Sequence, residues 1–233
     1  MSEHREGHQY IAGLWDYTVF MDMLWATESN RGQRPDMWRG PSWSWVSTTT
    51  TVTYAQASVY AIVDLYPEVV DSNVRVMSED RFGQVIRPTW IKIKGTLFSG
   101  GTVQYVQSPD EDPEDKQEGV TDYEIHANGA SLGSFRADYD FGIARVEPKA
   151  IVSDGSGVDL VLMAKTDNLY LYLVLIKLTP TRIPEWVVTQ EFDREGWIYI
   201  RERIGLLIVH HHLDTVDPVR QNLEASDEEV FII

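Results

Sequence analysis

Short segments of alternating apolar and polar residues follow one another along most of this chain, with Gly, Pro or Asp between them. In the run Ile91-Lys92-Ile93-Lys94 the alternation has the period of two that is typical of a half-buried strand. Many short strands with little helix between them favour a sandwich or barrel over a βαβ sheet. We therefore predict a mainly β protein, an antiparallel β-sandwich or barrel. The other expected strands are 48–64, 102–106, 122–126, 142–146, 158–164, 170–178, 186–190, 197–201 and 204–210.

The segment 170–178 differs from the other expected strands because it is apolar on both faces up to Lys177. Such a strand either lies in the centre, between two layers, or turns one face toward an internal cavity. The first arrangement is the commoner one, and the second is where a binding function would lie. The sequence leaves both open.

Two short helices are expected, one near each end. Asp16 is placed to cap a helix over Tyr17–Ala26, in which apolar residues recur at helical spacing. A short polar helix is expected within Pro218–Glu229. We interpret residues 1–233 as a single β domain with an N-terminal tail (1–9), an acidic mobile loop (108–119) and a C-terminal tail (217–233).

Composition limits the kinds of partner. The chain has 36 acidic and 20 basic residues, and its formal net charge of −16 repels phosphate backbones and anionic lipids. We therefore predict that it binds neither nucleic acid nor membranes; no apolar run approaches the roughly 18 residues of a membrane span. The first residues lack the apolar core of a secretory signal. Cysteine is absent, which excludes disulfides and thiolate chemistry and suits the cytoplasmic location that we expect.

Three tryptophan motifs occur in order within the first fifty residues: Tyr10-Ile11-Ala12-Gly13-Leu14-Trp15, Leu24-Trp25, and Gly40-Pro41-Ser42-Trp43-Ser44-Trp45-Val46-Ser47. Together they resemble the segment that follows the HET domain in fungal heterokaryon-incompatibility proteins. That family carries alanine where this chain has Gly40 and Val46. A looser similarity, to the family's tyrosine-x-arginine-x-glycine strand pair, lies in residues 196–206.

The resemblance implies a C-terminal β region of the HET type. Only nine residues precede Tyr10, so we expect this region to stand alone, without the HET domain and its cell-death signalling. The last motif, residues 40–47, is called the tryptophan box below. The proline at position 41 disfavours helix, and we expect an extended strand over the box with Trp43 and Trp45 on one face.

Tryptophan and tyrosine supply the strongest candidates for a binding site, since the chain has eight and eleven of them. Trp43 and Trp45 either clasp a helix onto the sheet or form part of an aromatic wall around an apolar ligand. Tyr172 lies on the strand that is apolar on both faces, and Trp197 lies on the next expected aromatic strand. We predict these four residues as substrate-binding.

Tyr199 and Arg201 share a strand face with Trp197. If that face lines a cavity, they offer a hydroxyl donor and a cationic donor, and we predict both as catalytic. The alternative is a packed strand end in which Arg201 pairs with a carboxylate. His126 is the third catalytic candidate; it precedes the hairpin signal Asn128-Gly129, where a histidine is more often a surface residue.

Signals for metals and cofactors are weak. On a strand, His210 and His212 of the run His210-His211-His212 would share a face and so be able to ligate a metal. We interpret the run instead as a polar strand end and predict no metal site. The sequence has no glycine-rich phosphate loop, no Gly-x-Ser-x-Gly elbow and no His-Glu-x-x-His motif, and we predict no cofactor.

Two classes of function fit these observations. The first is a cofactor-independent cyclase or isomerase of fungal specialised metabolism, a pericyclase of the Diels–Alder type. It would fold an apolar terpenoid or polyketide in an aromatic-lined pocket and activate a carbonyl with one or two donors. In size and architecture the chain is similar to the small cyclases of norbornene-forming, sordarin-type pathways. The second is a non-catalytic interaction or regulatory module of fungal allorecognition. A homo-oligomer is compatible with either class.

Overall fold

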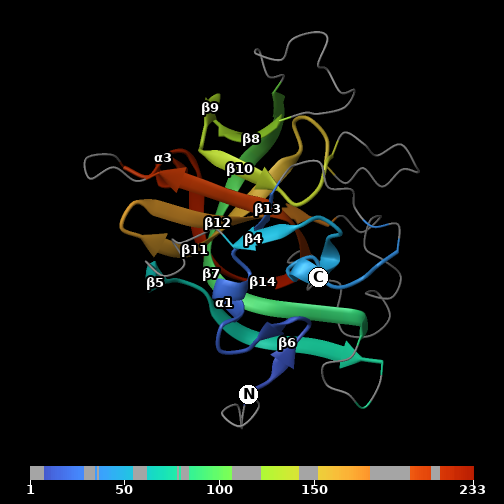
Figure 1. Cartoon of the computed structure of the whole chain (residues 1–233). Coiled ribbons are helices and arrows are strands. Elements are labelled where there is room, and N and C mark those ends of the chain that lie inside the picture. Colours follow the sequence, from blue (N-terminus) through green and yellow to red (C-terminus); the bar gives the residue numbers. More distant parts are fainter. Residues whose placement is uncertain are drawn as a thin grey trace.

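A computed structural model describes residues 8–28, 35, 37–54, 62–77, 79, 84–106, 122–141, 152–178, 200–210 and 216–233 (Figure 1). Three segments with predictions lie outside these ranges, namely the acidic loop at 108–119 and the strands expected at 142–146 and 186–190. In the described residues no helix is both long enough and apolar enough to cross a membrane.

The protein is mainly β, as predicted, and its described residues form a large sheet and two short α-helices. The helical elements are α1 (Val19–Asp22), the 3-10 helix η1 (Trp45–Ser47) and α3 (Pro218–Asn222). The strands are β1 (Tyr10–Ile11), β2 (Leu14–Trp15), β3 (Trp25–Thr27), β4 (Val52–Tyr54), β5 (Ile62–Leu65), β6 (Glu68–Val76), β7 (Val85–Val106), β8 (Asp122–Ala127), β9 (Ala130–Ser131), β10 (Ser134–Ala137), β11 (Gly157–Thr166), β12 (Leu169–Lys177), β13 (Ile200–His210) and β14 (Glu224–Ile232).

Five of these strands form a closed ring. β11 pairs with β12, β12 with β13, β13 with β14 and β14 with β7, and β7 then pairs back onto β11. All of these pairings are antiparallel except β13 with β14, which is a short parallel contact of Ile200 with Phe231 and Arg201 with Ile232. The arrangement is therefore that of a small barrel.

The other strands of the same sheet extend this ring, whereas β1 pairs with β2 and β3 with β4 in two separate sheets. β5 pairs with β11, β6 with β7, and β10 with β13. β8 pairs with the end of β7 and continues into β9 through a tight turn at Asn128 and Gly129, both with positive φ. These are the backbone angles of the hairpin turn that an Asn-Gly pair favours, so the predicted hairpin is confirmed.

Two apolar cores lie on opposite faces of the ring strands. Every ring strand contributes to the inner core, which fills the ring with Ile91, Ile93, Leu97, Val161, Met163, Leu171, Leu173, Leu175, Leu206, Val230 and Ile232. The outer core lies between β7, β11, β12 and β13 on one side and β8, β10 and α3 on the other. It includes Phe98, Val103, Tyr123, Ile125, Phe135, Phe141, Leu160, Leu162, Tyr172, Val174, Ile176, Leu207 and Val219.

β12 is the strand that the sequence marked as apolar on both faces, and it lies in the centre of the sheet. Its odd-numbered residues Leu171, Leu173 and Leu175 face the inner core, and Tyr172 and Val174 face the outer one. Each core is packed with side chains, so the double burial of β12 comes from two layers. This is the first of the two arrangements that the sequence left open.

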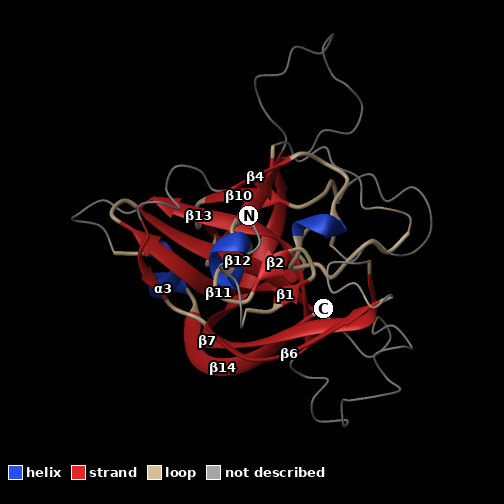
Figure 2. Cartoon of the chain, turned by 60° about the horizontal axis from the view of Figure 1, so that its bottom comes forward, coloured by secondary structure: helices blue, strands red, loops and turns tan. Residues whose placement is uncertain are grey.

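The N-terminal segment lies across one end of the ring. Figure 2 looks toward that end, with α1 and the β1–β2 hairpin across the opening and with β7, β14 and β13 around it. Ile11, Leu14, Val19 and Met23 from this segment are buried in the inner core. The segment therefore completes the core of the barrel. We call its described residues, 8–28, the plug.

The N-terminal helix is shorter than predicted. We expected Tyr17–Ala26, but α1 covers Val19–Asp22 only, and Trp25–Thr27 forms β3 against β4. Asp16 is not its N-cap. Its carboxylate instead accepts backbone hydrogen bonds from Gln9 and Tyr17, which closes the hairpin before the helix begins. A helix this short has little stability of its own, so the helix propensity of the following residues does not outweigh the pairing of Trp25–Thr27 with β4.

The tryptophan box and the C-terminal segment also differ from the prediction. The box is not a strand but a turn followed by η1, in which Ser44 Oγ accepts a hydrogen bond from the backbone N–H of Val46. A serine that caps a helical turn competes with extended structure. In the C-terminal segment, the helix ends at Asn222, and Glu224–Ile232 is a strand because it pairs along β7 for nine residues.

Candidate functional site

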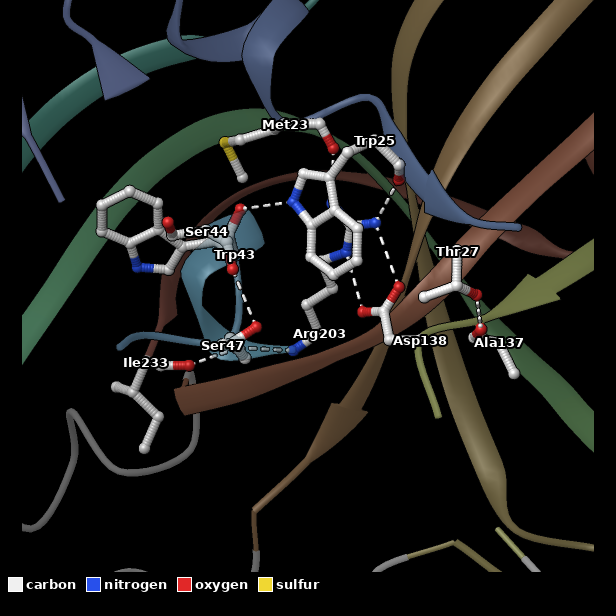
Figure 3. Close-up of polar contacts among 11 residues, drawn as sticks. Met23, Trp25, Thr27, Trp43, Ser44, Ser47, Ala137, Asp138, Arg203 and Ile233 are labelled. Carbon is white, nitrogen blue, oxygen red and sulfur yellow. Dashed lines mark hydrogen bonds and ion pairs between the residues drawn. The ribbon is translucent and has the colours of Figure 1, made fainter. Parts of the chain in front are cut away.

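A fully buried arginine holds the plug on the ring (Figure 3). Arg203 lies on β13, and its Nε and Nη2 atoms donate to the two carboxylate oxygens of Asp138 at 2.9 and 3.1 Å. Nη2 also donates to the backbone carbonyl of Trp25 at 2.6 Å, and Nη1 donates to that of Met23. The Arg203 side chain thus links Asp138, the residue that follows β10, to the plug.

The same guanidinium stacks on an aromatic ring. Its central carbon lies 3.6 Å from the centre of the Trp25 indole, which itself is completely buried. Such a contact combines cation–π attraction with dispersion, and it is strongest away from water. We call the group formed by Trp25, Asp138 and Arg203 the arginine clasp.

The geometry of β13 explains how the arginine reaches the plug. Opposite β12 the pairing shifts between Val174 and Leu175, so that Gly205 and Arg203 face them and Ile204 is the extra residue of a bulge. A Cβ atom on Gly205 would lie 2.4 Å from the carbonyl oxygen of Arg136. Glycine is therefore required where β10 pairs with β13, two residues from Arg203 of the clasp.

Burial dominates the electrostatics of the clasp. It raises the pKa of Asp138 and lowers that of Arg203, while the attraction between the two groups opposes both shifts. Because their hydrogen bonds are charge-assisted and the guanidinium has several accepting neighbours, the pair is stable as an ion pair. Its donors are engaged by the protein itself, which is the arrangement of a structural group.

The tryptophan box is joined to the clasp through backbone groups. Trp25 Nε1 donates to the carbonyl of Trp43 at 3.2 Å, and the backbone N–H of Arg203 donates to Ser42 Oγ at 3.0 Å. Ser42 Oγ in turn donates to the backbone oxygen of Ile233, and Ser44 Oγ donates to the carbonyl of Ala12 at 2.5 Å. The box therefore ties the plug, β13 and β14 together.

The two box tryptophans have different environments. Trp43 is fully buried in the inner core, and its Nε1 has no hydrogen-bond partner among the residues that the structure describes. Trp45 is 39% exposed, and its Nε1 donates to the carbonyl of Gly13 at 3.2 Å. The prediction that they share one face is wrong, because the 3-10 turn rotates Trp45 away from Trp43.

Aromatic side chains gather on the outer face of the β1–β2 hairpin. Tyr10 and Trp15 pack edge to face with ring centres 5.4 Å apart, Trp15 and Tyr17 are 6.3 Å apart, and Tyr17 and His8 are 4.5 Å apart. Tyr17 is 50% exposed, and Tyr10 and Trp15 are half-buried. We call these four residues the aromatic row.

The opposite face of this hairpin is rigidly fixed. Ile11 and Leu14 pair directly across the hairpin and are buried in the inner core. The tight turn between them uses Ala12 and Gly13, both at positive φ. A Cβ atom on Gly13 would lie 3.2–3.3 Å from three atoms of Ser44, Trp45 and Val46. The aromatic row is thus presented on a backbone that the tryptophan box supports.

The residues predicted as catalytic do not form one group within the part of the chain that the structure covers. Trp197 and Tyr199 lie outside the described ranges. Arg201 is buried, and its Nε donates to Asp159 Oδ2 at 2.6 Å, which is the ion-paired strand end considered as the alternative. His126 is part-buried on β8 and lies 2.6 Å from the carboxylate of Glu124.

The predicted binding residues are also separated. Tyr172 is fully buried in the outer core, where its hydroxyl donates to Asp217 at the start of α3. Burial, and then the hydrogen bond to this carboxylate, raise the pKa of Tyr172 far above the usual value. Trp43 lies in the inner core, on the other face of the sheet. One ligand cannot contact both.

For the histidine run, only its first member is described. His210 is the exposed last residue of β13, as a polar strand end would be, and 211–212 lie outside the described ranges. Among the residues with described positions, no group of three or more His, Asp or Glu side chains has the arrangement of a metal site.

Comparison of this chain with protein-family models, with curated proteins and with solved structures gave no match in any of the three.

Sequence reasoning missed Arg203 and Asp138, the pair at the centre of the clasp. A signal was present in the sequence. Three charged residues, Arg201-Glu202-Arg203, directly precede the uncharged run from Ile204 to Val209 in the same expected β region. Charged residues are rarely buried unless they are paired. Asp138 is 65 positions away in the chain, so its pairing with Arg203 becomes visible only in the folded structure.

Proposed function

We propose that this protein is a non-catalytic interaction module, and that the aromatic row is its contact surface. The observation that carries this proposal is the division of the β1–β2 hairpin into two faces. One face is locked into the inner core through Ile11 and Leu14, and the other carries the aromatic row, in which Tyr17 and His8 are exposed and Tyr10 and Trp15 are half-buried. Tyrosine and tryptophan are the residues most enriched at contact surfaces between proteins.

The hairpin is preorganised, which favours binding. Asp16 accepts hydrogen bonds from the backbone of Gln9 and Tyr17, and its carboxylate lies 3.2 Å from His8 Nδ1. The aromatic side chains are therefore held on a short, cross-bonded turn. A rigid aromatic surface loses little conformational entropy when a partner covers it.

The size of the barrel bears on the choice between the two classes of function. About eight strands enclose just enough space for side chains or one small ligand. This ring has five strands, and side chains from every one of them, with seven more from the plug, occupy its interior. A ligand pocket inside the ring would have to displace that core, so the interior supports a structural role.

The resemblance to the HET family bears on which residues form the scaffold and which form the contact surface. Of the residues that carry it, Trp25 belongs to the clasp, the tryptophan box supports the hairpin, and Tyr10 and Trp15 lie in the aromatic row. On this proposal the family pattern maintains the scaffold and part of the contact surface, and the exposed side chains of Tyr17 and His8 add to the choice of partner.

The proposal is tested by site-specific cross-linking. A photoreactive p-benzoylphenylalanine is incorporated in place of Tyr17 in the full chain, and in place of Tyr66 as a matched control, since both tyrosines are exposed. Illumination in an extract of the source organism should give one defined protein adduct at position 17 only. The adduct partner, identified by mass spectrometry and purified, should bind the unmodified chain and lose affinity for a Tyr17→Leu variant. Equal adducts at both positions would refute the proposal.

A second candidate remains the cofactor-independent cyclase that acts on an apolar terpenoid or polyketide. It is favoured by the position of Arg201, a buried cation at the seam where β13 meets β14, two residues after Tyr199 in the chain. Turnover of a candidate polyene substrate by the purified protein, reduced at least about tenfold by Tyr199→Phe, would support it.

A further inference from the structure

We infer that the aromatic row binds a basic segment of its partner through arginine side chains. This inference names the partner chemistry of the surface proposed above and therefore rests on that proposal. It is carried by three observations: the charge of the hairpin, the anchoring of its carboxylates beside the rings, and the way in which this protein already uses arginine on tryptophan.

The plug is uniformly acidic. From His8 to Asn30 the chain contains Asp16, Asp22 and Glu28 and neither lysine nor arginine. The whole chain has a net charge of −16, so the long-range field attracts a basic segment and repels an acidic one. A second copy of the chain would meet the same negative charge, which disfavours self-association through this surface.

Two of these carboxylates are fixed next to the rings. Asp16 Oδ1 accepts from the backbone N–H of Tyr17 at 2.7 Å. Asp22 Oδ2 accepts from Thr18 Oγ1 at 2.6 Å and from the backbone N–H of Trp15 at 3.4 Å. Two residues of the row, Trp15 and Tyr17, thus have a carboxylate bonded to their own backbone N–H. A guanidinium that lies on such a ring meets both a π face and a nearby negative charge.

Among the described residues a guanidinium lies on an aromatic ring three times, on Tyr170 through Arg220 and on two tryptophans. Arg203 lies 3.6 Å from the centre of the Trp25 ring, and Arg87 lies 5.1 Å from that of Trp38. Both tryptophans belong to the N-terminal part of the chain that resembles the HET family. Arginine suits this contact better than lysine because its planar, weakly hydrated guanidinium stacks on aromatic faces.

The inference is tested with synthetic peptides and the full chain. Three fluorescent twelve-residue peptides share a Gly/Ser/Pro background and carry four arginines, four lysines or four citrullines. Affinities are measured by anisotropy at 0.15 M and 0.5 M salt, where the screening length falls from about 8 Å to about 4 Å. At 0.5 M salt the arginine peptide should bind at least about fivefold more tightly than the lysine peptide, and the citrulline peptide should bind most weakly.

Variants locate the effect. Tyr17→Leu and the double variant Trp15→Leu/Tyr17→Leu should remove the preference for arginine over lysine, whereas Tyr66→Leu, at an exposed tyrosine of another surface, should keep it. Tyr17 is half exposed, so its single variant keeps the test valid if the double variant does not fold. Equal binding of the arginine and lysine peptides, or equal losses in Tyr66→Leu, would show a nonspecific charge effect and overturn the inference. Concentration-dependent dimers that Tyr17→Leu abolishes would overturn it as well, by assigning the surface to self-association.

The two proposals can fail separately. If cross-linking at position 17 identifies a defined partner whose affinity is unchanged when its arginines at the contact are replaced by lysine, the interaction module stands and the arginine chemistry is wrong. If no partner is captured at position 17, the module itself is wrong.

Discussion

The guanidinium of Arg203 lies 3.6 Å above the centre of the Trp25 indole, and the two residues are also joined by a hydrogen bond from Arg203 Nη2 to the carbonyl of Trp25. They are 178 positions apart in the chain. The contact couples β13 of the ring to the plug, and Asp138 neutralises the charge that it buries. The N-terminal segment is therefore an integral part of the barrel.

The clasp should be essential for stability. We expect Arg203→Met or Asp138→Leu alone to lower the free energy of unfolding by about 3–5 kcal/mol, because each leaves a buried charge without its partner. The double variant should be less destabilised than the worse single variant, since it buries no unpaired charge. Urea unfolding measures all three, with Arg220→Met, at a half-exposed arginine, as the control. A loss below about 1 kcal/mol in both single variants would contradict the clasp.

The two tryptophans of the box should behave differently. Trp43 is fully buried, so Trp43→Ala should lower the free energy of unfolding by about 3–5 kcal/mol. Trp45 is 39% exposed, and Trp45→Ala should cost about 1 kcal/mol, chiefly for the lost hydrogen bond to Gly13. Thermal melting of both variants gives the comparison. Equal losses would mean that Trp45 is as buried as Trp43.

Tyr172 should make stability depend on alkaline pH. Its folded-state pKa is raised by burial and by the bond to Asp217. The proton is therefore held more tightly in the folded state, and the stability that it contributes is complete below about pH 10, the pKa of an exposed tyrosine, and declines as the pH rises above it. Tyr172→Phe should be less stable than the parent protein by about 1–3 kcal/mol at pH 7, because Asp217 loses a buried donor.

The stability difference between Tyr172→Phe and the parent should then shrink above pH 10. Urea unfolding of both proteins between pH 7 and pH 11 measures it. A difference that stays constant over this range would show that Tyr172 ionises as an exposed tyrosine does.

Two glycines should differ in their tolerance of a methyl group. On Gly205 a Cβ atom would lie 2.4 Å from both the carbonyl oxygen of Arg136 and the ring of Phe135, so Gly205→Ala should lower the free energy of unfolding by about 3 kcal/mol or more. Gly157 has no atom within 4 Å of that position, and Gly157→Ala should be within about 0.5 kcal/mol of the parent. Denaturant midpoints of the two variants test the close packing of β10 and Phe135 against Gly205 on β13.

Local patterns predicted much of the secondary structure. Alternation identified β7 at Ile91–Lys94, apolarity on both faces identified β12, and Asn128-Gly129 identified the β8–β9 turn. Each of these signals depends on residues that are neighbours in the chain. Period and turn chemistry act over a few residues, so they can be recognised in the sequence without knowledge of the fold.

The same reasoning failed where distant partners decide the local conformation. The segment Glu224–Ile232 forms a strand because β7 pairs with it, and Trp45 faces solvent because Ser44 Oγ bonds to Ala12 and so fixes the turn of the box. Arg201 pairs with Asp159, which is far away in the sequence and which the local pattern could not name as its partner. In each case the deciding contact is absent from the local pattern.

The sequence by itself thus determined the β class, the strand that is apolar on both faces and the hairpin turn. Only the tertiary structure decided that the strands close into a ring, that the N-terminal segment plugs it, and that Arg203 is buried against Trp25 and Asp138. The physical reason is that a charge can be buried only where several partners converge on it. Arg203 lies on β13, its partners Trp25 and Asp138 lie on β3 and directly after β10, and folding alone brings the three together.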